Sequence, residues 1–190
     1  MLVGVLALQG DSREHIQLLE SLGVSSLPVK SSSDLLALDG LIIPGGESTT
    51  ISKLLDIFGL LDPIRDFAAS KPVLGTCAGL ILLSNTVEGL VSEQQLIGGL
   101  PISTSRNAYG GQLQSFEAEV TFSAGHQENV AFIRAPRILD PGPSEVLAKL
   151  GDEIVAVRHN NLFGATFHPE ITGGTELHKL FLEFVKSAQS

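Results

Sequence analysis

The sequence has 190 residues, of which 43% are hydrophobic, and its 12 Lys and Arg against 21 Asp and Glu give a net charge of −9. Residues 1–190 therefore suffice for one domain with a filled core, and the acidic balance without a basic run argues against nucleic acid as a partner. A lone cysteine allows no intramolecular disulfide, and neither a membrane-spanning apolar run nor a basic N-terminus is present, so we expect a cytoplasmic protein without membrane contacts.

The first half of the chain alternates apolar runs with amphipathic segments. The apolar runs predict strands at Met1–Leu8, Val24–Val29, Leu41–Ile43 and Pro72–Leu74. Apolar residues at helical spacing predict helices at Ser12–Leu22, around Ile51–Phe58 and from near Leu80. Asp34–Leu38 is predicted to be a short helix or a turn. Such alternation is typical of βαβ units, which place strands in a parallel sheet with helices on both faces.

The second half is richer in strands. Alternating patterns predict strands at Gln112–Phe122, Val130–Ile133, Ile154–Arg158 and Leu162–Phe167, and we expect some of them to extend the sheet in antiparallel fashion. Thr175–Ala188 is predicted to be a closing amphipathic helix, and no motif is assigned to Asn85–Leu100. The predicted fold is α/β, a flavodoxin-like three-layer sandwich with a mostly parallel central sheet and an antiparallel extension.

Three turns with glycine follow predicted strands of the first half. They are Gln9-Gly10, Gly45-Gly46-Glu47-Ser48 and Gly75–Gly79. Because ligands of open parallel sheets bind beyond the carboxyl ends of the strands, we expect these turns to meet at one site. Taken alone, Gly45-Gly46 is also compatible with an ordinary strand-to-helix turn.

The last of these turns has the pattern G-x-C-x-G around Cys77. This is the cysteine version of the nucleophile elbow, in which small residues permit a sharp turn that exposes the central side chain. A thiol at a helix N-terminus faces oriented N–H groups that favour its thiolate. The alternative is that Cys77 is a small buried apolar residue, as many free cysteines are.

A second candidate lies in Phe167-His168-Pro169-Glu170. Pro169 disfavours helix at His168, and in an extended chain His168 and Glu170 project to the same side. A carboxylate there can orient the imidazole and stabilise its charge. The alternative is a surface pair at a strand end. The remaining histidines lack a comparable setting: His15 and His178 fall in predicted helices, His126 and His159 in predicted turns.

Together these groups suggest a cysteine–histidine–carboxylate site, if the fold brings Cys77 and His168 into contact. The histidine would keep the cysteine as thiolate and later protonate a leaving amine. Attack on an amide carbon creates an oxyanion, for which the Gly45-Gly46 turn and the N–H of Ala78 are the candidate donors.

The motifs Gly75-Thr-Cys-Ala-Gly79 and His168-Pro-Glu170 resemble those of triad-type (class I) glutamine amidotransferases. More narrowly, five further segments resemble the glutaminase subunits of two-component pyridoxal 5′-phosphate synthases. They are Leu8-Gln-Gly10, Pro44-Gly-Gly-Glu-Ser-Thr-Thr50, Arg106-Asn-Ala-Tyr-Gly-Gly-Gln112, Ser115-Phe-Glu117 and Phe132-Ile-Arg-Ala-Pro136. One departure from the wider family is that Leu80 and Ile81, instead of a polar residue, follow the elbow.

This resemblance implies hydrolysis of L-glutamine, with no cofactor or metal, by Cys77 as nucleophile, His168 as acid and base, and Glu170 as orienting carboxylate. It also implies that a synthase subunit receives the ammonia in a hetero-oligomer and that the isolated chain is weakly active. The residues that it implies for glutamine binding are Gly46, Glu47, Ser48, Arg106, Ile133 and Arg134. Either arginine could pair with the substrate α-carboxylate, and Glu47 could accept from its α-ammonium.

Two other hypotheses remain open from the sequence. A cysteine hydrolase of the peptidase or deglycase type would share the reactive thiol and have no need of Arg106 or Glu47. A non-enzymatic flavodoxin-like binding module would have an unreactive Cys77 that lies far from His168.

Overall fold

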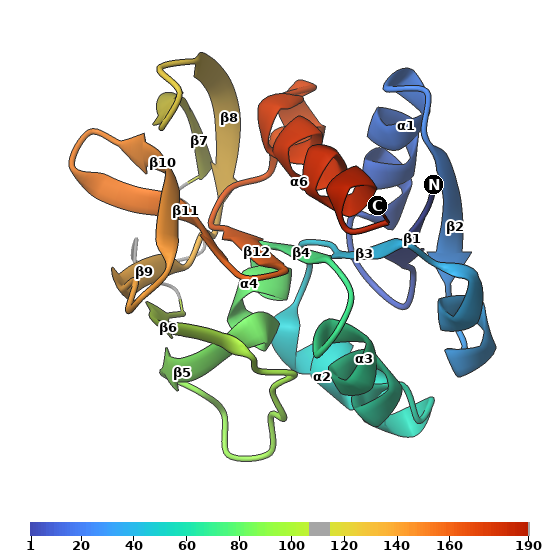
Figure 1. The fold of residues 1–190 in the computed structure, drawn as a ribbon. Helices are drawn as coiled ribbons and strands as arrows, with labels where there is room; N and C mark the ends of the chain where they lie inside the picture. The colour runs from blue at the N-terminus through green and yellow to red at the C-terminus, as the bar shows by residue number, and fades with distance from the viewer. Residues whose placement is uncertain (107–114, 190) are drawn as a thin grey trace.

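A nine-stranded sheet runs through the computed structural model, which describes residues 1–106 and 115–189 (Figure 1). Five neighbouring strands pair in parallel: β2 (Ser25–Val29), β1 (Leu2–Leu6), β3 (Gly40–Ile43), β4 (Val73–Thr76) and β12 (Leu162–Ala165). Antiparallel strands continue the sheet from β12: β11 (Glu153–His159), β10 (Glu145–Leu150), β7 (Ser115–Phe122) and β8 (Gln127–Ile133). The predicted parallel sheet with an antiparallel extension is confirmed.

Helices cover both faces of the parallel strands. One face carries α2 (Ser48–Ile57), α3 (Leu61–Ala68) and α4 (Ala78–Leu83), and the other carries α1 (Ser12–Ser21) and α6 (Glu176–Ser187) (Figure 1). Strand β3 shows how the sequence builds two cores, because successive side chains point to opposite faces. Leu41 and Ile43 pack in one apolar cluster, and Ile42 between them packs in the other. The three-layer sandwich is thus as predicted.

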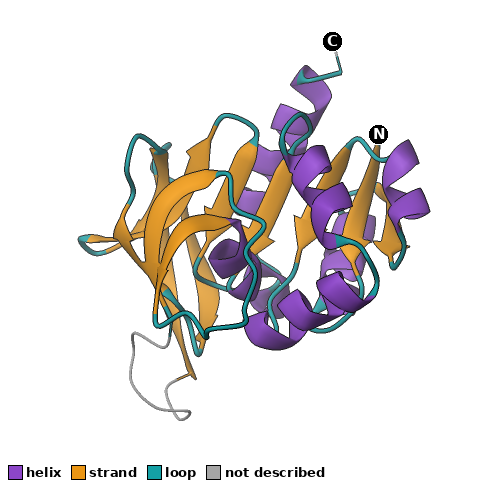
Figure 2. Cartoon of the chain, turned by 90° about the horizontal axis from the view of Figure 1, so that it is seen from below, coloured by secondary structure: helices purple, strands orange, loops and turns teal. Residues whose placement is uncertain are grey.

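The structure also contains elements that the sequence patterns did not predict. A second sheet orders its strands as β5 (Ser84–Glu88), β6 (Leu100–Ser105) and β9 (Arg137–Asp140), and β10 and α3 were likewise not predicted. Only the first residue of β5 is fully buried, so the strand lacks the apolar alternation that would mark it. Figure 2 shows the result, with helices gathered around the parallel strands and only strands and loops at the opposite end.

Several predicted boundaries shift by a few residues. The first strand is shorter than Met1–Leu8, the Asp34–Leu38 segment belongs to a 3-10 helix at Ser32–Ala37, and Leu162–Phe167 ends as a strand at Ala165. The predicted strand Gln112–Phe122 is described only from Ser115, because residues 107–114 lie outside the described residues. Across the described ranges, no helix combines the length and hydropathy needed to cross a membrane.

The three glycine-containing turns meet at the carboxyl edge of the parallel strands. The backbone N–H of Asp11, after β1, donates to the carbonyl of Gly45, after β3, at 3.1 Å. A Cβ atom on Gly10 would lie 1.8 Å from that same carbonyl oxygen, so only glycine allows the first turn to approach the second. This contact brings the candidate site together.

Candidate active site

Cys77 occupies a strained elbow between β4 and α4. Its φ of 48° and ψ of −100° are unusual for a non-glycine residue, and its N–H donates to the Ala165 carbonyl at 2.8 Å. Glycines permit the turn: a Cβ on Gly75 would lie 2.5 Å from backbone carbon of Gly79, and one on Gly79 would lie 2.1 Å from the Ile43 oxygen. Cys77 is 6% exposed, and its sulfur lies 3.8 Å from the Ile133 carbonyl oxygen.

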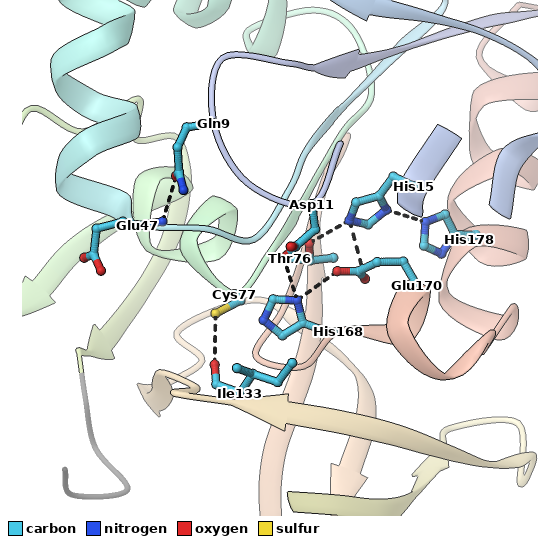
Figure 3. Close-up of polar contacts among 10 residues, drawn as sticks. All are labelled: Gln9, Asp11, His15, Glu47, Thr76, Cys77, Ile133, His168, Glu170 and His178. Atoms are coloured by element: carbon cyan, nitrogen blue, oxygen red, sulfur yellow. Dashed lines mark hydrogen bonds and ion pairs between the residues drawn. The ribbon is translucent and has the colours of Figure 1, made fainter. Parts of the chain in front are cut away.

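His168 reaches the same place from the end of β12. Its N–H donates to the Ala131 carbonyl at 2.8 Å, and Pro169 then begins the short helix α5 (Pro169–Thr172). His168 itself stays outside the helix, with φ −112° and ψ 87° and a β-bridge to Ala131, as predicted. Glu170 lies in a helical turn, so the prediction that the extended chain continues to Glu170 is wrong, since proline is well suited to the first helical position. The predicted contact nevertheless forms, with His168 Nδ1 and Glu170 Oε1 2.8 Å apart (Figure 3).

The electrostatics favour a protonated imidazole at His168. Burial lowers the pKa of this imidazole, but hydrogen bonds with Asp11, Cys77 and Glu170 raise it from 6.5 to about 12. Asp11 is a second carboxylate on the same nitrogen, with its Oδ2 3.3 Å from His168 Nδ1. The structure thus brings Cys77, His168 and Glu170 together, with the imidazole between the thiol and two carboxylates.

The Gly45-Gly46 turn lies directly against the imidazole. A Cβ on Gly45 would lie 2.2 Å from His168 Cε1, and one on Gly46 would lie 2.5 Å from Gln9 Oε1. Gln9 holds the turn by accepting the Glu47 backbone N–H at 2.9 Å. On the other side of the thiol, Ala78 is the first residue of α4, where backbone N–H groups have no partner within the helix. The candidate oxyanion donors therefore flank Cys77 and His168.

A pocket of about 290 Å³ lies beside these groups, and Gly46 but not Gly45 belongs to its lining. All six residues that the sequence suggested for substrate binding line it: Gly46, Glu47, Ser48, Arg106, Ile133 and Arg134. Cys77, Ala78 and His168 also line the pocket, as do Gln9, Asp11 and Ile81. A small polar molecule that enters would therefore meet the thiol and charged side chains together.

The charged lining consists of one carboxylate and two guanidinium groups. Glu47 Oε1 lies 3.4 Å from Arg106, and Glu47 Oε2 lies 2.8 Å from Arg134. Arg106 is mostly covered, with 12% of its side chain exposed, and Arg134 is 48% exposed. The segment that follows Arg106, up to Gln112, lies outside the described residues. Opposite charges in one pocket suit a zwitterion such as an amino acid.

The sequence interpretation missed a polar cluster behind the triad. His15 and His178 are fully buried, and His15 Nε2 lies 3.4 Å from Glu170 Oε2, so the prediction that these histidines have no comparable setting is wrong. Helical spacing could have found both: His15 shares an inner face with Leu19, and His178 shares one with Phe181. Asp11 was also missed, although it directly follows the first glycine-containing turn.

Asp11, His168 and Glu170 are also a geometric candidate for a cation, because their ligand atoms lie within 4.8 Å of one another. A metal ion would need a free lone pair on the imidazole nitrogen between the carboxylates. The hydrogen bonds that raise the pKa of His168, despite its burial, to about 12 instead hold a proton there. This group of residues fits a proton better than a metal ion.

A parallel α/β sheet with a cysteine at a strand-to-helix elbow, beside a histidine and a buried carboxylate, defines a cysteine hydrolase of the α/β class. Residues 5–187 match the SNO glutamine amidotransferase family, and the chain belongs to that family. Neither the peptidase or deglycase alternative nor the non-enzymatic module is favoured by this match. The module also required Cys77 to lie far from His168, whereas both side chains line the same pocket.

Curated relatives match almost the whole chain. One is the pyridoxal 5′-phosphate synthase subunit PdxT of Frankia casuarinae, 47% identical over 99% of this chain and 96% of its own length. The PdxT subunit of Brevibacillus brevis is 46% identical over 100% of both chains. A crystal structure of a glutamine amidotransferase superposes with a TM-score of 0.91 at 43% identity, over 97% of this chain and 98% of that one.

Proposed function

We propose that this protein hydrolyses L-glutamine to glutamate and ammonia and passes the ammonia to a pyridoxal 5′-phosphate synthase subunit. In this proposal the two subunits form a hetero-oligomer in the cytoplasm. The names of the curated relatives and the family match support the assignment. The observation that carries it is the shared pocket, in which the Cys77 thiol and the His168 imidazole face the charged groups of Glu47, Arg106 and Arg134.

The first half of the reaction transfers the acyl group to Cys77. The Cys77 sulfur, as thiolate paired with protonated His168, attacks the side-chain amide carbon of glutamine. The carbonyl oxygen becomes an oxyanion and accepts N–H groups from the Gly45-Gly46 turn and from Ala78. His168 then gives its proton to the amide nitrogen as the C–N bond breaks, which releases ammonia and leaves a thioester.

The second half hydrolyses this thioester. Neutral His168 takes a proton from water, and the resulting hydroxide attacks the thioester carbon. The C–S bond breaks, glutamate leaves with the new carboxyl group, and Cys77 returns to a thiolate beside protonated His168. Glu170 stabilises the imidazolium in both resting and product states through its 2.8 Å contact with Nδ1.

The charged groups of the pocket recognise the amino-acid end of the substrate. An arginine can bind the α-carboxylate through two parallel hydrogen bonds, and Glu47 can accept from the α-ammonium. Because Arg106 and Arg134 both form ion pairs with Glu47, glutamine that binds here would exchange ion pairs within this cluster of charges.

The test is ammonia release from glutamine by the chain mixed with a pyridoxal 5′-phosphate synthase subunit. We expect Cys77→Ala to lower this rate by about 10³-fold or more, since the nucleophile is lost. We also expect the isolated chain to be much less active than the mixture, as the resemblance implies that docking arranges the oxyanion turn.

A matched control is Ser123→Ala, a small substitution at an exposed residue between β7 and β8. It should leave the rate unchanged. Full ammonia release by Cys77→Ala would refute the mechanism, and turnover of a peptide or a glycated compound without turnover of glutamine would refute the substrate.

A further inference from the structure

A buried polar cluster lies on the far side of Glu170 from Cys77. It contains two histidines from helices at opposite ends of the chain, His15 on α1 and His178 on α6, both with no exposed surface. Figure 3 shows His15 next to the Glu170 carboxylate, with His178 on one side of His15 and Thr76 on the other. Nothing in the proposed reaction uses these imidazoles, and neither histidine lines the pocket.

The contacts form a chain that ends on the carboxylate. His178 Nε2 lies 2.9 Å from His15 Nδ1, and His15 Nε2 lies 3.1 Å from Thr76 Oγ1. The same His15 nitrogen lies 3.4 Å from Glu170 Oε2. Since Glu170 Oε1 contacts His168, the two carboxylate oxygens face two different imidazoles.

Only one placement of protons suits these contacts when both imidazoles are neutral. If His15 Nδ1 carried the proton, its Nε2 lone pair would face the carboxylate, and the buried His178 Nδ1–H would have no acceptor among the described residues. In the opposite order His178 Nε2–H donates to His15 Nδ1, and His15 Nε2–H points to Thr76 and Glu170. The unpaired imidazole nitrogen is then an acceptor, which costs less than an unpaired donor. Glu170 Oε2 is buried without a hydrogen-bond partner among the described residues, and in this arrangement the atom 3.4 Å from it is an N–H rather than a lone pair.

We propose that His15 is a positioning residue that directs an Nε2–H at Glu170 Oε2, and that His178 fixes His15 in this tautomer. The carboxylate is thereby oriented and kept ionised for His168. This inference rests on the roles proposed for Cys77, His168 and Glu170.

Burial explains why a neutral donor is needed at this place. It raises the pKa of Glu170, an effect opposed by His168 and increased by the charge of Asp11. Burial also lowers the pKa of His15, as do the charges of His178 and His168, and lowers the pKa of His178 to about 4. A neutral imidazole can stabilise the carboxylate by hydrogen bonding without becoming a second cation that competes with His168 for it.

The test compares His15→Leu, which removes the donor, with His15→Gln, whose amide N–H can replace Nε2–H. The readout is the rate of Cys77 alkylation by iodoacetamide in the whole chain, measured against pH, because thiolate reactivity depends on a charged His168 and hence on ionised Glu170. We expect His15→Leu to shift the acidic side of the alkylation-rate profile to higher pH by about one pH unit, and to lower kcat for glutamine about tenfold. His15→Gln should restore most of both effects.

A control is His126→Leu, which removes an exposed imidazole and should leave the profile unchanged. The proposal would be overturned if folded His15→Leu showed the same pH dependence of Cys77 alkylation as the native chain. It would also be overturned if His15→Gln lost as much reactivity as His15→Leu, since His15 would then serve only to fill space in the core. A second measurement covers the case in which both variants fail to fold: nitrogen NMR of the native histidines. Neutral His15 with its proton on Nε2 supports the proposal, and a proton on Nδ1 overturns it. The alkylation profile and the nitrogen NMR do not use glutamine, so their failure is distinct from failure of the proposed glutaminase reaction.

Discussion

His168 separates two regions of the site that differ in their contact with water. On one side lies the pocket, whose Glu47 and Arg134 side chains are 38% and 48% exposed. On the other side lies the cluster of His15, Glu170 and His178, whose side chains are sealed from solvent. Both regions combine carboxylates with cationic groups or imidazoles. The effective dielectric constant is high in the pocket, which water reaches, and lower in the buried cluster, so charges interact more strongly in the cluster.

The difference assigns a separate task to each region. In the pocket, water screens the ion pairs, which are worth about 0–1 kcal/mol each when exposed, so they can exchange partners when a substrate arrives. In the sealed cluster, a change of protonation is costly, so the arrangement of protons is fixed before substrate binds. Substitutions on the buried side should change the chemistry, and substitutions on the pocket side should change binding.

The substitution Glu170→Gln is the strongest test of this division between a buried side that governs the chemistry and a pocket side that governs binding. The amide can still accept from His168 Nδ1, but it carries no charge to stabilise the imidazolium. We expect kcat for glutamine to fall by roughly 10³-fold with little change in KM, because the lost interaction acts on the reacting groups. Steady-state kinetics with the synthase subunit present would measure both constants.

The matched control is Glu119→Gln on β7, an exposed carboxylate away from the site. It should leave kcat and KM unaltered. A Glu170→Gln enzyme with near-normal kcat and raised KM would show that the buried region serves binding, and the division proposed above would be wrong.

A second test uses the stability of the sealed cluster at acid pH. Burial lowers the pKa of His178 from 6.5 to about 4. Between pH 6.5 and about 4, His178 is therefore protonated in the unfolded chain and neutral in the native chain. Stability from this group is therefore complete above pH 6.5 and is lost as the pH falls towards 4, by about 3 kcal/mol in all. We expect the unfolding free energy of His178→Leu, measured with urea, to lack the decrease at acid pH that His178 causes in the native chain.

The relevant quantity is the difference in unfolding free energy between the native chain and His178→Leu at several pH values. That difference should shrink on acidification, whereas the difference for Ser123→Ala, at an exposed residue without an ionisable group, should stay flat. Parallel curves for the native chain and His178→Leu would show that the imidazole titrates as freely in the native state as in the unfolded one.

The two regions also differ in how well they could be predicted from the sequence. The pocket side could be predicted, because Cys77, the Gly45-Gly46 turn and Glu47 directly follow apolar strands, and parallel strands end at one edge. The buried side could not, because His15 and His178 are 163 positions apart and only the packing of α1 against α5 and α6 makes them neighbours. The helical spacing places both histidines on apolar helix faces, but it does not indicate that they contact each other or Glu170.

The fold divides in the same way. Strands buried on both faces, such as β3 with Leu41–Ile43, are continuous apolar runs that a sequence displays plainly. The strand β5 exposes most of its residues, and β10 pairs with its neighbour through an irregular register, so neither carries a clean alternation. Such strands are specified by the neighbours that they pair with, which a local pattern does not contain.

The mildest test concerns the pocket side and asks which arginine takes the substrate carboxylate. Arg106 is the more covered of the two, so its ion pair with substrate would be screened less by water. We expect Arg106→Ala to raise KM for glutamine roughly 30-fold and Arg134→Ala about 5-fold, with kcat changed less than about twofold in both. Neither variant should shift the pH profile of Cys77 alkylation, because both side chains lie on the open side of His168. A larger KM effect from Arg134→Ala would assign the carboxylate to Arg134, and a shifted alkylation profile in either variant would mean that the two regions are electrostatically coupled through His168.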